Sequence, residues 1–207
     1  MALCGTAGST VAAVSRSIPG IATSASNKAV PYFNVTGPSH PAVMAAKVAF
    51  EVVNEFIENT PEGQKVLPLG YGVNVNIPDL VNGTMPPVVK TRLTGNANTD
   101  VAVYNETTGL FDWDNVDPLA AGINAQYNGD VSLPDETWVV AGGAVSVSAF
   151  TMDWSAPSIG YTEGVYAKVE GLFSDSAGFN ASGYSKRMVE ERMRKRGAML
   201  SGRDGGA

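Results

Sequence analysis

The sequence predicts an α/β fold, because helical and strand-like patterns follow one another along the chain. A helix-compatible run at 11–14 precedes a short apolar strand at 20–23, and helix then strand is half of a βαβ unit. A long helical pattern follows at 41–58, and alternating strand patterns come after it. The length of 207 residues and the hydrophobic content of 44% are those of one domain with a substantial core.

The charge balance limits the classes of partner. The chain has 14 basic and 20 acidic residues, a net charge of −6 and a pI near 4.8. Because no basic field is present, we expect neither a nucleic acid polymer nor a membrane as partner. No apolar run approaches the roughly 20 residues that span a bilayer. The single cysteine excludes an internal disulfide and a multi-cysteine metal site.

The opening stretch 4–10 combines small and hydroxyl residues and leads directly into a helix. Free backbone N–H groups at a helix N-terminus attract phosphate, so this stretch is a candidate anion site. The alternative is a polar turn that caps an ordinary helix, with Thr6, Ser9 or Thr10 satisfying the free N–H groups. Gly8 is not followed by lysine, which excludes a Walker loop, and no arginine closes a cysteine phosphatase loop.

The helix at 41–58 has proline at its first position and Ser39 or His40 as its cap. His40 is the only histidine, and we expect it to cap the helix rather than act as a catalytic base. Polar residues fall on one narrow stripe of this helix, so we expect most of its circumference to be buried. The stripe consists of Lys47, Glu51, Asn54, Glu55 and Glu58.

Strand patterns dominate the second half. Asn74 and Asn76 alternate with apolar residues at 73–77, which predicts a strand with one polar face. Further strands are expected at 88–94 and 101–104, an irregular acidic region at 105–136, and a long strand-like pattern at 138–154. Helices are expected at 163–173 and 186–200. The acidic run 112–117 is either a calcium loop or a solvated loop, and lacking an EF-hand pattern it favours the second.

Four Asn-x-Ser/Thr triplets favour a secretory or vacuolar route over the cytoplasm, although no signal peptide is visible. Their acceptor residues are Asn34, Asn82, Asn105 and Asn180.

Four stretches in the right order resemble the SurE family, the survival-protein-E phosphatases or 5′/3′-nucleotidases, and most closely its eukaryotic members. Residues 4–6 with 12–13 and 18–22 resemble the Ser-Gly-Thr motif, its helix and the Pro-Ala-Ile-Ala strand. Residues 67–78 resemble the Leu-Asn-Val-Asn-Val-Pro strand, and 89–93 resemble the Thr-Arg strand. Residues 141–150 with Asp153 resemble the closing Gly-Tyr-Val-Ser-Ile-Thr-Pro-Leu strand and its Asp.

The resemblance implies a Rossmann-type three-layer α/β fold, N-terminally truncated, with a projecting β-hairpin arm and a C-terminal helical extension. It divides the chain into a partial SurE-like phosphatase domain at 1–155, with the arm at 96–135, and an extension at 156–207. It also implies that Cys4, Gly5 and Thr6 bind phosphate, with Cys4 replacing the serine of the family motif and offering a weaker donor.

The family function is hydrolysis of phosphomonoesters, nucleoside monophosphates among them, with Mg or Mn as cofactor. The family's metal ligands lie in an Asn-Asp-Asp-Gly strand and in later loops, all upstream of the position of Cys4. We therefore expect this chain to supply no metal ligand and to be inactive by itself. Family members are dimers or tetramers, so a homo-oligomer is expected. The alternatives are a non-catalytic oligomerisation subunit and a fragment of an incomplete gene model.

Overall fold

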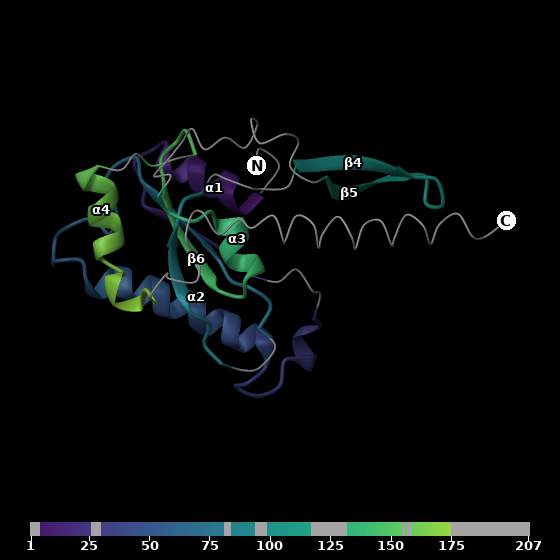
Figure 1. Ribbon diagram of the computed structural model, residues 1–207, viewed down its shortest axis with the longest axis horizontal. Coiled ribbons are helices and arrows are strands. Elements are labelled where there is room, and N and C mark those ends of the chain that lie inside the picture. The colour runs from purple at the N-terminus through teal and green to yellow at the C-terminus, as the bar shows by residue number, and fades with distance from the viewer. Residues whose placement is uncertain are drawn as a thin grey trace.

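The computed structural model describes residues 5–25, 30–80, 84–93, 99–116, 132–154, 156 and 159–174. Helices and strands alternate along this part of the chain, as Figure 1 shows. The elements are α1 (Gly5–Val14), β1 (Gly20–Ser24), the 3-10 helix η1 (Tyr32–Asn34), α2 (Pro41–Glu58), β2 (Gly72–Asn76), β3 (Val88–Thr91), β4 (Thr99–Asn105), β5 (Leu110–Val116), α3 (Glu136–Ala141), β6 (Val145–Phe150), α4 (Gly160–Ala167) and the 3-10 helix η2 (Glu170–Leu172).

Four strands form a mixed sheet in the order β1-β2-β6-β3. β1 and β2 are parallel, β6 is antiparallel to β2, and β3 is parallel to β6. The register places Asn74 opposite Ser148 and Asn76 opposite Ser146. Because side chains alternate along a strand, these four side chains share one face of the sheet.

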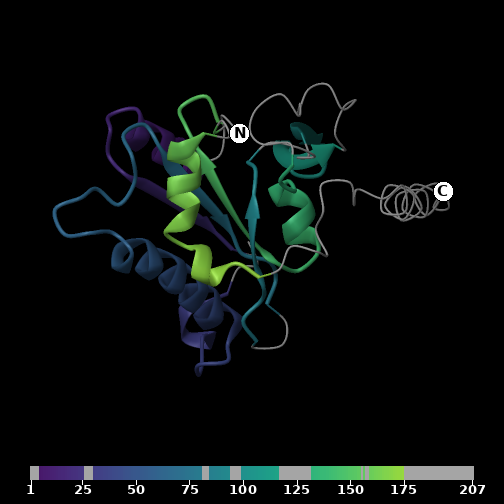
Figure 2. The ribbon, with the colours of Figure 1, turned by 60° about the vertical axis from the view of Figure 1, so that its left-hand side comes forward.

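Helices cover both faces of this sheet, which gives three layers (Figures 1 and 2). α2 and α4 bury their apolar side chains in one core cluster with the valines of β2 and β6. α1 and α3 lie on the opposite face, where Val14 packs with Phe150 and Val139 packs with Val89. The predicted α/β fold with three layers is therefore confirmed.

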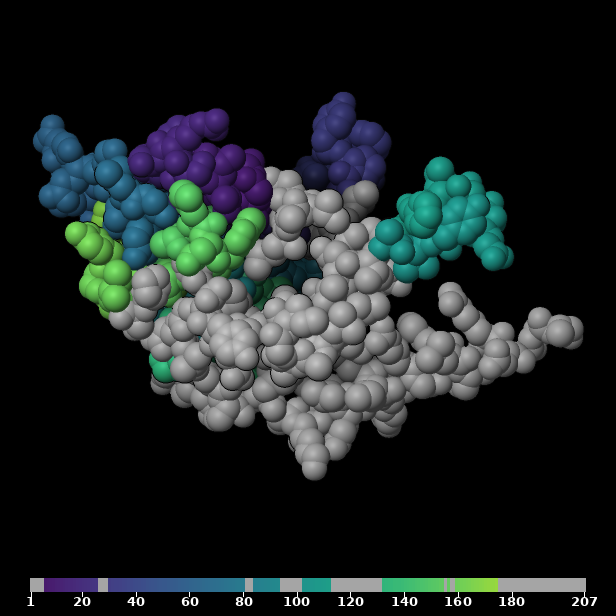
Figure 3. Space-filling view, turned by 90° about the horizontal axis from the view of Figure 1, so that it is seen from above, coloured from purple at the N-terminus to yellow at the C-terminus, as the bar shows by residue number. Residues whose placement is uncertain are grey.

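The strands β4 and β5 form an antiparallel hairpin of their own, paired from Thr99 with Val116 to Asn105 with Leu110. The hairpin extends away from the three-layer body (Figures 1 and 3). The projecting hairpin arm expected within 96–135 is present. The irregular region expected at 105–136 is wrong for its first part, because residues 110–116 are paired in β5 and Asp112 accepts a hydrogen bond from Asn105 at 2.7 Å. Residues 112–116 of the loop expected at 112–117 belong to this strand, and Asp117 lies outside the described residues.

The bounds of α2 agree with the prediction, and His40 is its cap, because its Nδ1 accepts a hydrogen bond from the N–H of Ala42 at 3.1 Å. The expectation that most of α2 is buried is wrong. Phe50 and Ile57 are 65% and 54% exposed, and only one stripe of the helix faces the sheet. That stripe follows the i, i+4 spacing and consists of Met44, Val48, Val52 and Phe56.

The predicted strand pattern at 138–154 divides into two elements. Residues Glu136–Ala141 form α3, because Asp135 caps the helix by accepting a hydrogen bond from the N–H of Trp138 at 2.9 Å. The strand itself, β6, begins only at Val145. The helix expected at 163–173 is α4, which begins earlier, at Gly160, and gives way to η2. The helix expected at 186–200 lies outside the described residues, and the division at residue 155 stays a prediction.

Candidate functional site

The stretch predicted to bind phosphate forms the beginning of α1. Gly5 is the first residue of the helix and Thr6 lies exposed in its first turn, whereas Cys4 is outside the described residues. The hydroxyls of Ser9 and Thr10 both donate to the carbonyl oxygen of Thr6 at 2.9 Å. The expectation that Ser9 or Thr10 satisfies free N–H groups at this end is therefore wrong. Phosphate binding by Cys4, Gly5 and Thr6 stays a prediction.

Two glycines bring α1 close to the sheet. Gly20 and Gly72 pair with each other across β1 and β2. A Cβ atom at Gly20 would lie 2.7 Å from Thr10 Cγ2, and one at Gly72 would lie 2.9 Å from Val14 Cγ2. The side chains of Ala7, Thr10 and Val14 form the buried stripe of the helix. α1 thus packs over β1 and β2, on the face of the sheet that carries Asn74.

That face carries an unusual number of polar side chains for the interior of a sheet. We call this group the polar strip. Of its members, Asn74, Thr91, Ser146 and Ser148 are 6%, 0%, 0% and 0% exposed, so the polar groups are interior ones rather than solvent-facing ones. The strip consists of Asn74, Asn76, Thr91, Ser146 and Ser148 of the sheet together with Glu136 of α3.

Hydrogen bonds connect the members of the strip. Glu136 Oε2 accepts from Asn74 Nδ2 at 2.9 Å and from Ser148 Oγ at 3.4 Å. The hydroxyls of Ser148 and Thr91 are 2.7 Å apart, and Asn76 Nδ2 donates to Ser146 Oγ at 3.4 Å. Buried polar groups cost free energy unless they are paired, and this network supplies the partners.

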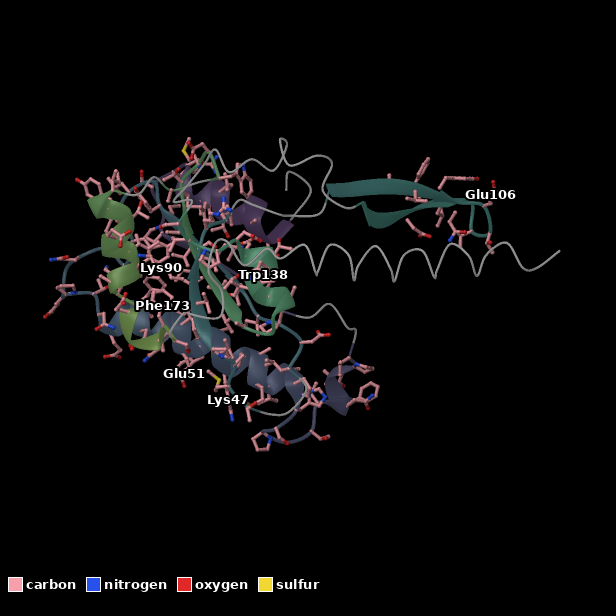
Figure 4. The ribbon with its side chains drawn as sticks, viewed as in Figure 1. Lys47, Glu51, Lys90, Glu106, Trp138 and Phe173 are labelled. Carbon is pink, nitrogen blue, oxygen red and sulfur yellow. The ribbon has the colours of Figure 1, made fainter. Side chains whose placement is uncertain are left out.

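Glu136 is positioned by the junction between β3 and α3. Its N–H donates to the carbonyl oxygen of Arg92, while the N–H of Arg92 donates to the carbonyl oxygen of Pro134. Asp135 then starts α3 and turns the carboxyl group of Glu136 inward onto β2 and β6. Figure 4 shows α3, with Trp138, on the opposite side of the sheet from α4. The residue as a whole is half-buried, and its carboxyl group is the part that meets the strip.

Burial makes this carboxyl group unusual. Desolvation raises the pKa of Glu136 to about 7, and it outweighs the hydrogen bonds from Asn74 and Ser148, which lower that pKa. The neighbouring charge of Asp135 adds to the rise. A carboxyl group whose pKa lies near neutrality exchanges a proton readily in that range, as acid–base residues of active sites do.

Apolar clusters close the strip on both sides. One consists of Val14, Leu93 and Phe150, between α1 and the end of β6. The other joins Val89 of β3 to Val139 of α3 and to Ala144. These clusters exclude water from the sides of the strip, which explains the desolvation of Glu136.

Sequence reasoning did not single out Glu136, although a signal for the strip exists. Asn74 and Asn76 are two residues apart, as are Ser146 and Ser148, so each strand has a polar face. The polar face of a strand normally points to solvent, and here two helices cover it. The tertiary arrangement, rather than the local pattern, places Glu136 beside these residues.

A cavity of about 580 Å³ lies under the beginning of α2, next to the ends of β1 and β2. Its walls include Thr23, His40 and the small side chains Ala42, Ala45 and Ala49. Within the described ranges, no three His, Cys, Asp or Glu side chains come together as they would to hold a metal ion. None of the helices in those ranges combines the length and the apolar character needed to cross a bilayer.

The described residues form a three-layer α/β protein with a projecting hairpin. Comparison with known proteins shows which family it is similar to. The model of survival protein SurE matches residues 1–100. An acid phosphatase of Yarrowia lipolytica is 38% identical over 168 residues, which cover 75% of this chain and 46% of that enzyme. These two matches support membership of the SurE family.

A solved structure, that of the SurE protein from Aquifex aeolicus, is similar with a TM-score of 0.38 and 19% identity. The similarity covers 73% of this chain and 52% of that protein. The chain thus spans about half the length of the relatives that it matches.

Proposed function

We propose that this chain is part of a metal-dependent phosphomonoesterase that acts on nucleoside monophosphates or similar phosphate esters. The observation that carries the proposal is the 38% identity to an acid phosphatase over 168 residues. The match of residues 1–100 to the model of survival protein SurE supports the same assignment.

No three His, Cys, Asp or Glu side chains come together among the described residues, and the role proposed for these residues is to bind and orient the substrate. Phosphate is held by Cys4, Gly5 and Thr6, because the N–H groups at the start of α1 and the Thr6 hydroxyl are donors that suit phosphoryl oxygens. The Mg or Mn of the family would polarise the phosphoryl group when bound. Since this contribution is essential to the family reaction, we propose that the 207-residue chain alone does not hydrolyse phosphate esters.

Hydrolysis of p-nitrophenyl phosphate and AMP, with Mg or Mn and with or without EDTA, tests both statements. No turnover is expected from the 207-residue chain. Turnover that EDTA abolishes would overturn the inactivity and support the enzyme class, whereas turnover that EDTA leaves unchanged would overturn the metal dependence.

Binding of inorganic phosphate tests the role of α1 without any turnover. In amide NMR spectra, phosphate is expected to shift the signals of Gly5 and Thr6, and Thr6→Val should weaken this binding by about tenfold, the loss of one hydrogen bond to a charged group. Ser15→Ala is the matched control, because the Ser15 hydroxyl donates to Ala12 at the other end of α1. Unchanged binding by the Thr6 variant would remove this residue from the site.

A second function, self-association, is favoured by the hairpin arm. Tyr104 and Phe111 are 54% and 71% exposed and meet edge to face, with ring centroids 5.3 Å apart. Exposed aromatic pairs are typical of interface centres. We propose that the arm joins copies of the chain into a dimer or tetramer. Light scattering should give a multiple of 21.5 kDa, and Phe111→Ser should lower the mass while Thr107→Ser should not. A monomeric wild-type chain would contradict this role.

A further inference from the structure

The polar strip ends on a carboxyl group that the proposed function does not use. We propose that Glu136 is the proton-linked group of the polar strip: it binds a proton as the solution becomes acidic, and the hydroxyl chain of Ser148 and Thr91 then reverses its direction of donation.

The geometry allows both directions. When Glu136 is ionised, its Oε2 accepts from Ser148 Oγ, and Ser148 in turn accepts from Thr91 Oγ1 at 2.7 Å. When Glu136 is protonated, it donates to Ser148, whose hydroxyl proton then turns to Thr91 Oγ1. Hydroxyl groups rotate freely between donor and acceptor roles, so no heavy atom needs to move. Glu136 keeps a partner in both states.

Among the described residues, no cation contributes to the shift in the pKa of Glu136. On α3 the adjacent charge is that of Asp135, which opposes ionisation. Just after β3, the carbonyl oxygen of Arg92 accepts from the N–H of Glu136, and Arg92 Nε donates to the carbonyl oxygen of Leu133. Lys90 lies on the opposite face and pairs with Glu163 of α4 at 2.9 Å.

The other elements packed against the strip contribute no charge either. The sequences of α1, β1, β2 and β6 contain no titratable side chain. Among the described residues, hydrogen bonds and no cation thus stabilise an ionised Glu136, and burial of the carboxyl group favours its neutral form.

The proton has a consequence for ligands on this face of the sheet. With Glu136 ionised the strip carries a negative charge, and with Glu136 protonated it carries none. Because α1 packs on the same face, we expect this negative charge to weaken the binding of an anion at the start of α1 as the pH rises. This consequence rests on the proposed function, whereas the proton linkage itself does not.

Unfolding by urea tests the linkage directly. Because the pKa of Glu136 is raised in the folded state, its contribution to stability is present at low pH and is lost as pH rises from the unfolded value toward about 7. Between about pH 5 and about pH 8, the unfolding equilibrium constant of the wild type should rise on the order of 100-fold more than that of Glu136→Gln. Glu51→Gln, an exposed carboxyl group of α2, should follow the wild type. Equal pH dependence of the wild type and Glu136→Gln would overturn the proposal.

A measurement on the wild type keeps the test decisive if Glu136→Gln does not fold. The infrared band of a protonated carboxylic acid should persist at about pH 6, where exposed carboxyl groups are ionised. Its absence would overturn the proposal.

Sulfate, which does not titrate in this range, tests the consequence for ligands. Sulfate should bind the wild type more tightly at about pH 5 than at about pH 8, and this ratio should shrink at least several-fold in Glu136→Gln. Equal ratios would overturn the repulsion. If sulfate binds at neither pH, the proposed phosphate-ester function loses its support, while the urea measurement still decides the linkage.

Discussion

The two faces of the four-stranded sheet differ although the same strands build both. Toward α2 and α4, Val73, Val75 and Val147 are at most 1% exposed and belong to one apolar core. Toward α1 and α3, the neighbouring residues Asn74 and Ser148 are buried as well but belong to a hydrogen-bonded network. The comparison indicates a division of roles: the first face provides stability, and the second holds a titratable group.

The two faces also respond differently to their surroundings. Apolar burial stabilises by about 25 cal/mol for each Å² and does not depend on pH. A buried polar network contributes little net free energy when complete and costs several kcal/mol when one partner is missing. The polar face is therefore the one whose stability depends on single hydrogen bonds and on protons.

Placing a polar residue on the apolar face should have the largest effect. Val75→Asn puts an amide among side chains that offer no partner, since Val75 is 0% exposed within the main core. The expected loss is about 3 to 5 kcal/mol of unfolding free energy, from lost apolar burial and an unpaired polar group. Urea unfolding measures it, and Val75→Ile is the control. A loss below about 1 kcal/mol would mean that the two faces are not distinct.

The contact between α1 and the polar face should be next in size. In Gly72→Ala the added Cβ would lie 2.6 Å from Phe150 Cζ and 2.9 Å from Val14 Cγ2, and both side chains are closely packed. We expect a loss of about 1 to 3 kcal/mol in thermal or urea unfolding. Gly8→Ala is the matched control, because nothing lies within 4 Å of its Cβ position. That helical substitution should stabilise by about 0.5 to 1 kcal/mol. Equal effects of the two variants would show that α1 does not pack against the sheet here.

Removing one donor from the strip should act through pH. The hydrogen bond from Asn74 to Glu136 Oε2 lowers the pKa of that carboxyl group. Asn74→Ala deletes this hydrogen bond, so the pKa of Glu136 should rise further above about 7. We expect a loss of about 1 to 2 kcal/mol above neutral pH and a smaller loss at acidic pH, where Glu136 is protonated in both proteins. Asn54→Ala on α2 is the control in the same pH series. A pH-independent loss would show that Asn74 acts by packing alone.

The smallest effect is expected at the rim of the apolar face. Lys90 Nζ lies 2.9 Å from Glu163 Oε2, and the side chain of Glu163 is 52% exposed. Such exposed ion pairs contribute about 0 to 1 kcal/mol, so Glu163→Gln should change the unfolding free energy by no more than that, and added salt should reduce the difference. A salt-independent loss above about 2 kcal/mol would contradict this expectation, because it would show that the pair stabilises the fold more than exposed ion pairs do.

The sequence predicted most elements of the fold and only part of the candidate site. The bounds of α2 and its His40 cap follow from local chemistry, and the alternation at 73–77 predicted the polar face of β2. The exposure of Phe50 could not be predicted, because the hydrophobic pattern of α2 does not show how much surface its neighbours cover. Glu136 was missed for a similar reason. Its partner Asn74 is distant in sequence, and the two meet because β2 pairs with β6 and α3 packs against β6.

The pKa of Glu136 in the folded protein is the most direct test of the difference between the two faces of the sheet. Carbon NMR of side-chain carboxyl groups measures this pKa, and Glu136→Gln assigns the signal. We predict a pKa of about 7, against the ordinary glutamate value of 4.5. A value near 4.5 would contradict it, because the carboxyl group would then be solvated like one on the surface, and the polar face would not be an interior one.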